Sequence, residues 1–414
     1  MLEKIIAPYR KIENHIYWLI AAQFFLQLIN GSFFILFNYY MLDKGFQDFE
    51  IASIVEKRFL AVMLFAFPLG LFIKGRNLKP LFYLAAFGMP TFALLTIFGA
   101  ESDMLWLLKL GIFGVGLSFI FMQATALPFV LLNAKKETHT ESIALLFQTW
   151  VSGIIAIGIL YFVLNKIDAV LFSERNIMIA CACLAYVGVF FISQIKIKEN
   201  VSTKFPLKNI AKAYDWGIIV KAVIPTMIIA IGAGFTIPFI SLFFEKVHGV
   251  SSDEFALMSS STYILVFFGM MIIPIVKRRF GYKIAITLVQ ALSIVALVLM
   301  ATTEWYAHLP WAIGVAIFFY IIRQPLMNVA GPMTSEMTMY YVGKKNQELI
   351  SAINMSIWSG SWFFSSRIFA ILREQEVGYA TIFMITAIMY VLGVVWYNYL
   401  INQYHKKQKE EANA

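Results

Sequence analysis

Twelve long apolar segments constrain this chain more than any other feature of it. Each holds roughly 20 residues or more, enough for a helix to cross a hydrocarbon core of about 30 Å. Hydrophobic residues make up 60% of the 414 residues and charged residues 14%, a balance outside that of soluble domains. We therefore predict an all-α membrane protein with these spans: 16–40, 51–73, 80–100, 104–133, 143–165, 177–195, 218–245, 255–276, 283–302, 309–335, 349–372 and 378–402.

Lysine and arginine in the connections predict the orientation. With the N-terminus inside, 22 basic residues fall in the inner connections and tails, and five fall outside: Lys44, Lys166, Arg175, Lys246 and Arg373. Because cytoplasmic loops carry the excess of basic residues, we predict a plasma membrane of the bacterial inner-membrane type, with both termini cytoplasmic. Basic loops facing an anionic leaflet also account for the net charge of +9, so we expect no nucleic-acid partner.

The two halves of the chain repeat each other. Five positions recur at a constant offset of 204 residues: Gly45 with Gly249, Glu50 with Glu254, Ala52 with Ala256, Lys79 with Lys283, and Pro128 with Pro332. We predict a six-helix half over 1–195, a basic cytoplasmic linker over 196–217, a second six-helix half over 218–402 and a cytoplasmic tail over 403–414. Parallel repeats of this kind are typical of carriers with a substrate site near the midplane.

Over its whole length the chain resembles the major facilitator superfamily, in its twelve spans, cytoplasmic termini and basic central loop. The resemblance implies a cytoplasmic latch formed by six residues: Gly70, Arg76, Lys79, Arg278, Arg279 and Gly281. The family's signature has an Asp before the Arg of this loop, but here Lys74 stands in its place, and the second-half copy also lacks the acid. The glycine–proline pair of the antiporter signature is absent from span five, which counts against a drug–proton antiporter.

Apart from the first and last residues of the spans, seven charged side chains lie within them: Glu56, Lys57, Arg58, Lys109, Lys221, Arg323 and Arg367. Such groups usually face a cavity or a partner, because burying them in lipid costs several kcal/mol. Lys109 and Lys221 lie near span ends and are expected to reach the interface. Arg323 lies about 21 Å into span ten at 1.5 Å per residue, and span ten lines the central cavity in the resembled family. Two interpretations of Arg323 stay open: contact with substrate or a coupling ion, or a structural ion pair or helix cap.

Glu56, Lys57 and Arg58 are neighbours on span two. Successive side chains on a helix point about 100° apart, so we expect these three to neutralise one another poorly. The resemblance implies that spans two and eleven face each other, which predicts an outer gate formed by Glu56 and Arg367. Alternatively, Lys57 and Arg367 simply reach outward to the interface. A desolvated Glu56 is also a candidate carrier of a coupling proton, although the adjacent cations oppose its protonation.

Polar side chains also recur within the spans. The candidates for substrate binding or coupling are, with Arg323, Arg58 and Glu56, the following amides: Gln27, Asn30, Gln123, Gln324 and Asn328. Two interpretations stay open for them, hydrogen bonds that pack helices or a hydrated cavity for substrate.

These observations predict a secondary carrier rather than an enzyme, moving a small organic solute by alternating access and coupled to a proton or another ion. The excess of intramembrane cations favours an anion that bears a carboxylate or a phosphate. One alternative is an exporter of amphipathic compounds or drugs, which the aromatic fraction of 16% favours. Another is a non-transporting receptor or scaffold on the same fold.

All five histidines fall in connections and flanks, so we expect no metal site and no cofactor, and we expect a monomer.

Overall fold

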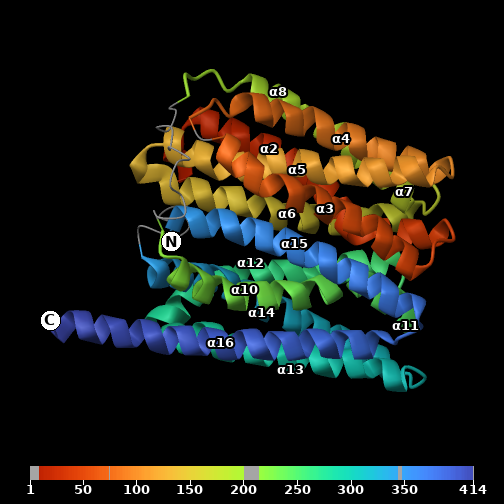
Figure 1. Cartoon of the computed structure of the whole chain (residues 1–414). Coiled ribbons are helices and arrows are strands. Elements are labelled where there is room, and N and C mark those ends of the chain that lie inside the picture. Colours follow the sequence, from red (N-terminus) through yellow and green to blue (C-terminus); the bar gives the residue numbers. More distant parts are fainter. Residues whose placement is uncertain (1–8, 74, 200–213, 344–346, 414) are drawn as a thin grey trace. The chain divides into compact units, whose positions relative to one another are not determined.

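The computed structural model describes residues 9–73, 75–199, 214–343 and 347–413, and almost all of them are helical (Figure 1). Long apolar stretches form helices because a membrane-embedded backbone must satisfy its hydrogen bonds internally. The helices of the first half are α2 (Asn14–Asp43), α3 (Asp48–Phe72), α4 (Lys79–Glu101), α5 (Leu105–Asn133), α6 (His139–Ile167), α7 (Glu174–Ala185) and α8 (Val187–Ser193). Those of the second half are α10 (Trp216–Thr236), α11 (Ile240–His248), α12 (Ser252–Tyr282), α13 (Val289–Ala301), α14 (Ala312–Val342), α15 (Gln347–Glu374) and α16 (Tyr379–Asn413).

Each predicted span corresponds to one helix or to two consecutive pieces, so the twelve-helix fold is confirmed. Span six consists of α7 and α8, which are interrupted at Tyr186. Span seven consists of α10 and α11, joined by a 3₁₀ turn over Ile237–Phe239 that contains a proline. Span nine begins with a π-helical turn over Lys283–Leu288 before α13. These interruptions explain why the twelve spans appear as more than twelve helices.

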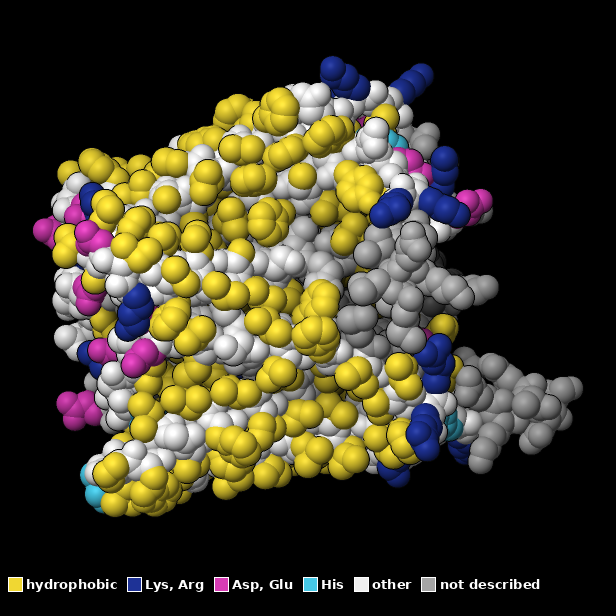
Figure 2. Space-filling model, turned by 180° about the vertical axis from the view of Figure 1, so that it is seen from behind, with side chains coloured by type: hydrophobic (Ala, Val, Ile, Leu, Met, Phe, Trp, Pro, Cys, Tyr) yellow, Lys and Arg dark blue, Asp and Glu magenta, His cyan; other side chains and the backbone are white. Residues whose placement is uncertain are grey.

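Nine helical stretches in the described part of the chain are long and apolar enough to cross a membrane. Helix α3 is not among them, because each stretch of 18 residues along it contains Glu56, Lys57 and Arg58. Large apolar side chains are exposed along the helices, α3 included, and Figure 2 shows them spread over the middle of the face that it draws. A surface of this kind is solvated by lipid rather than by water, as in a multi-pass membrane protein.

The chain divides into two compact units. The first contains Met1–Pro206 and Ser252–Ser260, and the second contains Leu207–Ser251 and Ser261–Ala414. In the first, α5 packs against α3 and α4, while α2 packs against α6, α7 and α8; in the second, α10 packs against α15 and α16, and α13 against α14 and α16. The predicted linker, 196–217, falls largely on residues 200–213, which lie outside the described residues. The predicted boundaries of the halves stay a prediction.

Glycine allows helices of the first unit to approach closely. A Cβ added to Gly116 on α5 would lie 2.3 Å from the backbone oxygen of Arg58 on α3, and one added to Gly111 would lie 2.6 Å from the backbone nitrogen of Thr96 on α4. Since no side chain fits at these distances, both positions require glycine. Close packing of small residues stabilises helix pairs in lipid, where the hydrophobic effect between helices is missing. The contact at Gly116 also fixes the position of Arg58.

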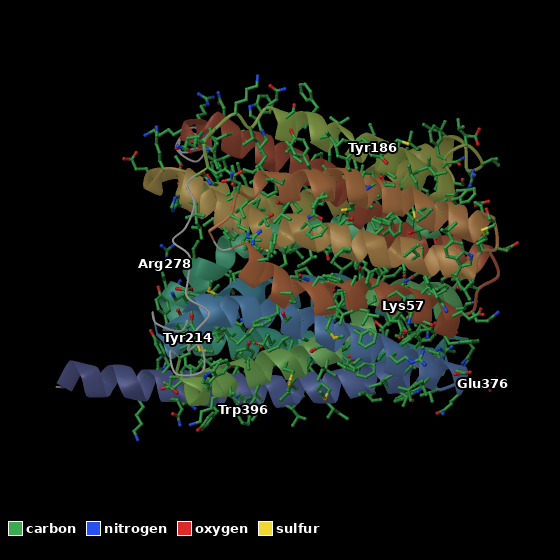
Figure 3. All side chains as sticks on the ribbon, turned by 45° about the horizontal axis from the view of Figure 1, so that its top comes forward. Lys57, Tyr186, Tyr214, Arg278, Glu376 and Trp396 are labelled. Atoms are coloured by element: carbon green, nitrogen blue, oxygen red, sulfur yellow. The ribbon has the colours of Figure 1, made fainter. Side chains whose placement is uncertain are left out.

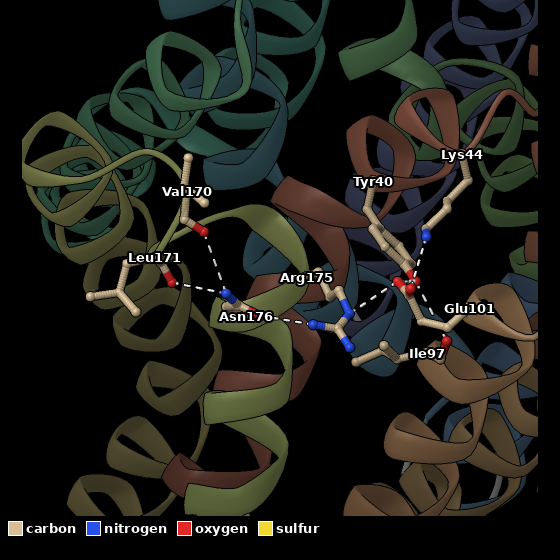
Figure 4. A network of polar contacts seen from close by, with 8 residues as sticks. All are labelled: Tyr40, Lys44, Ile97, Glu101, Val170, Leu171, Arg175 and Asn176. Carbon is tan, nitrogen blue, oxygen red and sulfur yellow. Dashed lines mark hydrogen bonds and ion pairs between the residues drawn. The ribbon is translucent and has the colours of Figure 1, made fainter.

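An ion cluster joins the ends of α2, α4 and α7 (Figure 4). The Glu101 carboxylate accepts hydrogen bonds of 2.8 Å from the Tyr40 hydroxyl and from Lys44 Nζ, and it lies 3.0 Å from Nε of Arg175. A single exposed ion pair contributes little to stability. Three donors converging on one carboxylate nevertheless fix the relative positions of three helix ends.

Glu13 ties the start of α2 to the connection after α5. Its Oε1 accepts a hydrogen bond of 3.1 Å from the backbone nitrogen of Lys135, and its Oε2 accepts one of 3.0 Å from the Thr138 hydroxyl. Burial alone would raise the pKa of Glu13. Hydrogen bonds from two backbone N–H groups and from Thr138, together with the charge of Lys135, outweigh burial and hold this pKa below its ordinary value of 4.5.

The lowered pKa of Glu13 predicts a pH-dependent contribution to stability. Because the folded state holds the carboxylate ionised, the contribution is complete above the unfolded pKa, about 4.5, and is lost as the pH falls through the lower folded value. Glu13→Gln should therefore lower the free energy of unfolding near neutral pH by about 0.5 kcal/mol, because the group is only half-buried, and the apparent melting temperature should fall with it. The difference from wild type should shrink as the pH falls below 4.5, because the wild-type carboxylate becomes protonated first in the unfolded and then in the folded state. Melting curves of both proteins across this range check it, and a difference independent of pH would contradict it.

Candidate functional site

Three predicted site residues meet in the first unit. Asn30, which is 1% exposed on α2, donates a hydrogen bond of 2.6 Å to Oε1 of Gln27, one helical turn before it. The Asn30 side-chain oxygen accepts a hydrogen bond from Nη2 of Arg58 on α3. The Arg58 guanidinium carbon lies 5.6 Å from the centre of the Phe119 ring on α5. Within the described ranges, no carboxylate forms an ion pair with Arg58.

Glu56 pairs with its neighbour on α3 rather than with Arg58. Nζ of Lys57 lies 2.6 Å from Oε1 of Glu56, whose side chain is 2% exposed, whereas that of Lys57 is 30% exposed. The expectation that these adjacent groups neutralise one another poorly is therefore wrong for this pair, because the flexible lysine stem reaches back to the carboxylate. Figure 3 labels Lys57 on α3. The contact balances the buried acid and leaves the charge of Arg58 without a carboxylate in the described residues.

A second arginine cluster lies in the second unit. Arg323 on α14 is 1% exposed. Its Nη1 donates a hydrogen bond of 2.6 Å to Oε1 of Gln324, and its Nη2 donates one of 3.4 Å to the Tyr390 hydroxyl on α16. Its Nε has no acceptor among the described residues. The Ser293 hydroxyl on α13 donates a hydrogen bond of 3.1 Å to the Arg323 backbone oxygen, so helices α13, α14 and α16 all position this residue.

The hydrogen-bond partners of Arg323 bear on its two interpretations, which are contact with substrate or a coupling ion, and a structural ion pair or helix cap. A structural ion pair has no carboxylate among the described residues. A buried guanidinium with neutral acceptors and one unsatisfied N–H is costly, because burial weakens its hydration while no opposite charge compensates it. The geometry therefore favours a role in which an anion arrives from outside the protein, although that role stays a prediction.

The other amide side chains on these spans differ in their surroundings: some form hydrogen bonds within or between helices, and Gln123 is half-buried. Nδ2 of Asn328 donates a hydrogen bond of 2.8 Å to the backbone oxygen of Gln324, within its own helix. Gln23, which lies on the same stripe of α2 as Gln27, reaches the backbone oxygen of Leu146 on α6 at 3.4 Å. Gln123 is half-buried on α5. Packing accounts for some of the predicted stripe, and the arginine clusters account for Gln27, Asn30 and Gln324.

The predicted latch region of the first unit contains an acid that the sequence analysis missed. The carboxylate of Glu199 accepts hydrogen bonds of 2.6 Å and 2.9 Å from the backbone nitrogens of Leu78 and Lys79, at the start of α4. Nζ of Lys79 donates a hydrogen bond of 2.6 Å to the backbone oxygen of Ile195. A carboxylate at a helix N-terminus is favourable, so Glu199 supplies a negative charge to a loop that lacks the expected Asp. The one sequence feature that could have indicated this role is the position of Glu199, an acidic residue within the basic linker.

The other predicted latch residues, and Arg367 of the predicted gate, lie on several different helices and connections. Arg76 lies over the Phe72 ring at 4.1 Å, and Gly281 breaks α12 one residue before its end with φ +76°, a conformation that favours glycine. Gly70 lies within α3, and Arg278 and Arg279 lie in the last turns of α12. Arg367 is exposed on α15 in the second unit. The latch and the contact of Glu56 with Arg367 stay predictions.

A polar network that sequence reasoning missed fastens the start of α12 within the first unit. The Tyr161 hydroxyl lies 2.8 Å from Oε1 of Glu174 and 2.8 Å from the Ser252 hydroxyl, which also donates to Glu174. Nζ of Lys166 lies 2.7 Å from Asp253. These residues are far apart in the chain, so no sequence pattern groups them. The one sequence feature that could have indicated the network is the repeated motif from Gly249 to Ala256, which contains Ser252 and Asp253.

No protein-family model and no curated protein sequence matches this chain. The structure is similar to that of a bacterial homologue of the iron transporter ferroportin in its inward-facing state, with a TM-score of 0.72, 10% identity, and coverage of 93% of this chain and 98% of that one. A D-xylose–proton symporter gives 0.70, 14% identity, and coverage of 92% and 96%, and the nucleoside transporter NupG gives 0.66, 15% identity, and coverage of 94% and 99%. The chain has the major facilitator fold. At such low identities the major facilitator likeness establishes the fold, and the substrate must be argued from the side chains.

Proposed function

We propose that this protein is a secondary carrier that moves a small organic anion across a membrane by alternating access. One observation carries the proposal. Arg58 and Arg323 each donate to neutral hydrogen-bond acceptors deep within a helical unit, and neither forms an ion pair with a carboxylate of the described residues.

The chemistry of the two guanidinium groups indicates the substrate class. A cation at membrane depth costs several kcal/mol unless a partner compensates it. A carboxylate or a phosphate would do so, because it matches the planar donor fork of arginine through two parallel hydrogen bonds. A neutral solute would leave both charges uncompensated. The proteins of similar fold are transporters of iron, xylose and nucleosides by name, which supports transport as the activity and shows that the fold itself does not choose the substrate.

The coupling ion follows less directly from the structure. Glu56 is an acid buried in α3, and it forms an ion pair with the Lys57 ammonium at 2.6 Å. A proton carried by Glu56 therefore requires this ion pair to open during the transport cycle. If a proton rather than another ion is coupled to transport, opening of the Glu56–Lys57 pair is the step that would admit it.

A second candidate function is export of amphipathic compounds. It is favoured by Trp358 and Trp362 on α15, whose rings lie 6.2 Å apart at an angle of 67°, with Trp358 partly exposed. Aromatic walls of this kind bind apolar rings. Such substrates should not require both arginines, which separates this candidate from an anion carrier.

A ligand screen followed by a flux measurement tests the proposal. The purified protein is heated with monocarboxylates, dicarboxylates, phosphate esters, neutral sugars, nucleosides and amphipathic cations. We expect anions alone to raise the melting temperature, because a ligand that binds the folded state stabilises it, and we expect the stabilising anion to enter protein-containing liposomes. Stabilisation by cations or neutral solutes alone would contradict the anion class. Binding of an anion without flux would indicate a receptor or scaffold instead of a carrier.

A further inference from the structure

Three cations gather where α12 ends. Arg278 and Arg279 lie in its last turns, and Lys283 follows directly after the helix breaks at Gly281, which has φ +76° and ψ 178°. The π-helical turn Lys283–Leu288 then leads into α13. All three cationic side chains are exposed. The break therefore brings basic groups from two consecutive helices to one end of the second unit, and Figure 3 labels Arg278 there.

The acid next to these cations is already engaged. Nζ of Lys277 lies 2.6 Å from Glu336 on α14 and 4.7 Å from the centre of the Tyr282 ring. Arg279 lies over the exposed Phe280 ring at 5.3 Å. None of Arg278, Arg279 and Lys283 forms an ion pair with an acid of the described residues. No acid of the described residues therefore compensates these three exposed positive charges.

An aromatic cluster places these cations at the depth of lipid headgroups. The Tyr404 ring of α16 lies 6.2 Å from that of Tyr282 and 6.5 Å from that of Tyr340, which is 54% exposed on α14. Tyrosines are enriched at the boundary between hydrocarbon and water, because the ring is apolar and the hydroxyl is polar. The three rings bring α16 together with the last turns of α12 and α14 near the basic residues, which is the kind of aromatic cluster expected at this boundary.

We propose that this basic–aromatic face, formed by Arg278, Arg279, Lys283, Tyr282, Tyr340 and Tyr404, binds the headgroup phosphates of anionic phospholipids. The arginines and Lys283 donate to phosphate oxygens, and the Tyr340 and Tyr404 rings pack against the adjoining glycerol and acyl groups, while the buried Tyr282 ring supports Tyr404. Each basic residue near an anionic membrane surface strengthens attraction by about fivefold, so three together enrich anionic over zwitterionic lipid on the order of 100-fold. The inference does not depend on which solute the protein carries.

Lipid retention by the full-length protein tests the proposal. The protein is purified from mixed micelles of phosphatidylglycerol and phosphatidylcholine, and both retained lipids are counted by mass spectrometry. Arg278→Gln, Arg279→Gln and Lys283→Gln together should abolish the preference for phosphatidylglycerol. A matched control removes three other exposed cations, Arg10→Gln, Lys11→Gln and Lys135→Gln, and should keep most of it. Replacing Arg278 and Arg279 by Lys should also keep most of it, because attraction to the surface depends on charge.

The outcomes separate a built lipid site from general electrostatics. Equal losses in the two triple variants would overturn the proposal, since net charge alone would then explain retention. Displacement of the lipid by excess inorganic phosphate would also overturn it, because a phosphate site needs no lipid. Retention that survives inorganic phosphate, weakens with added salt and fails in the first triple variant alone would establish the site. Gel filtration confirms that each variant is folded.

Discussion

Replacing Arg323 by Ala should reduce flux of the transported anion by about 100-fold or more while the protein stays folded. A hydrogen bond to a charged group contributes about 1.5–3 kcal/mol, and two such bonds to a bound anion account for this loss. Folding should survive because removing a buried cation that has no carboxylate among the described residues offsets part of the cost of the cavity that Ala leaves. Flux into liposomes and the melting temperature are measured together. Arg323→Lys should recover little, since an ammonium does not reproduce the planar fork.

Three further variants isolate the guanidinium of Arg323. Arg323→Met fills much of the same volume without charge and should behave like the Ala variant. Tyr390→Phe removes the acceptor at 3.4 Å from Nη2 and should reduce flux less, because Gln324 still orients the group. Lys221→Gln removes an exposed cation from α10 and should leave flux unchanged. Wild-type flux in both the Ala and Met variants would show that Arg323 serves the structure alone.

Hydrophobic periodicity and length determine much of this fold. A stretch of about 20 apolar residues has no stable alternative to a helix in lipid, so the sequence was sufficient to place the twelve spans. Breaks within spans were not predicted, because the turn at Ile237–Phe239 and most of the π-helical turn at Lys283–Leu288 are as apolar as the helices that they join. Pro238 was the one residue that could have indicated the first break.

Contacts between helices were much less predictable than the helices. Asn30 and Arg58 could be named as candidate site residues because each is polar or charged within a span. Their contact could not be predicted, because it depends on how closely α3 approaches its neighbours, and Gly116 determines that distance. The argument that neighbouring side chains on a helix point about 100° apart was also wrong for Lys57, because a long side chain can reach a neighbour whose Cβ points elsewhere. Glu199 was missed because its role comes from the N-terminus of α4, more than a hundred residues earlier. Side-chain reach and helix rotation are three-dimensional quantities that one sequence does not contain.

Removing Lys57 should destabilise the protein more than removing Glu56 does. Lys57→Met leaves the Glu56 carboxylate, 2% exposed, without its ammonium partner, and breaking a buried pair from one side costs about 3 kcal/mol. Glu56→Gln leaves the Lys57 ammonium, which is 30% exposed and reaches water or headgroups more easily. Melting temperatures of the two single variants and the double variant check this asymmetry. Equal losses from the two single changes would show that the carboxylate is better solvated than its burial indicates.

The same carboxylate allows a test of the predicted outer gate. If Glu56 leaves Lys57 to pair with Arg367 when the outer side closes, Glu56→Gln and Arg367→Gln should each favour the outward-open state, and their effects should not add. The readout is labelling from outside of a cysteine at Phe46, in a background without Cys181 and Cys183, because φ +85° makes a side chain at Gly45 unfavourable. The charge swap Glu56→Arg with Arg367→Glu should restore part of the closure, since attraction survives reversal. A coupling energy below about 0.5 kcal/mol would mean that the two residues do not meet and that Lys57 is the functional partner of Glu56.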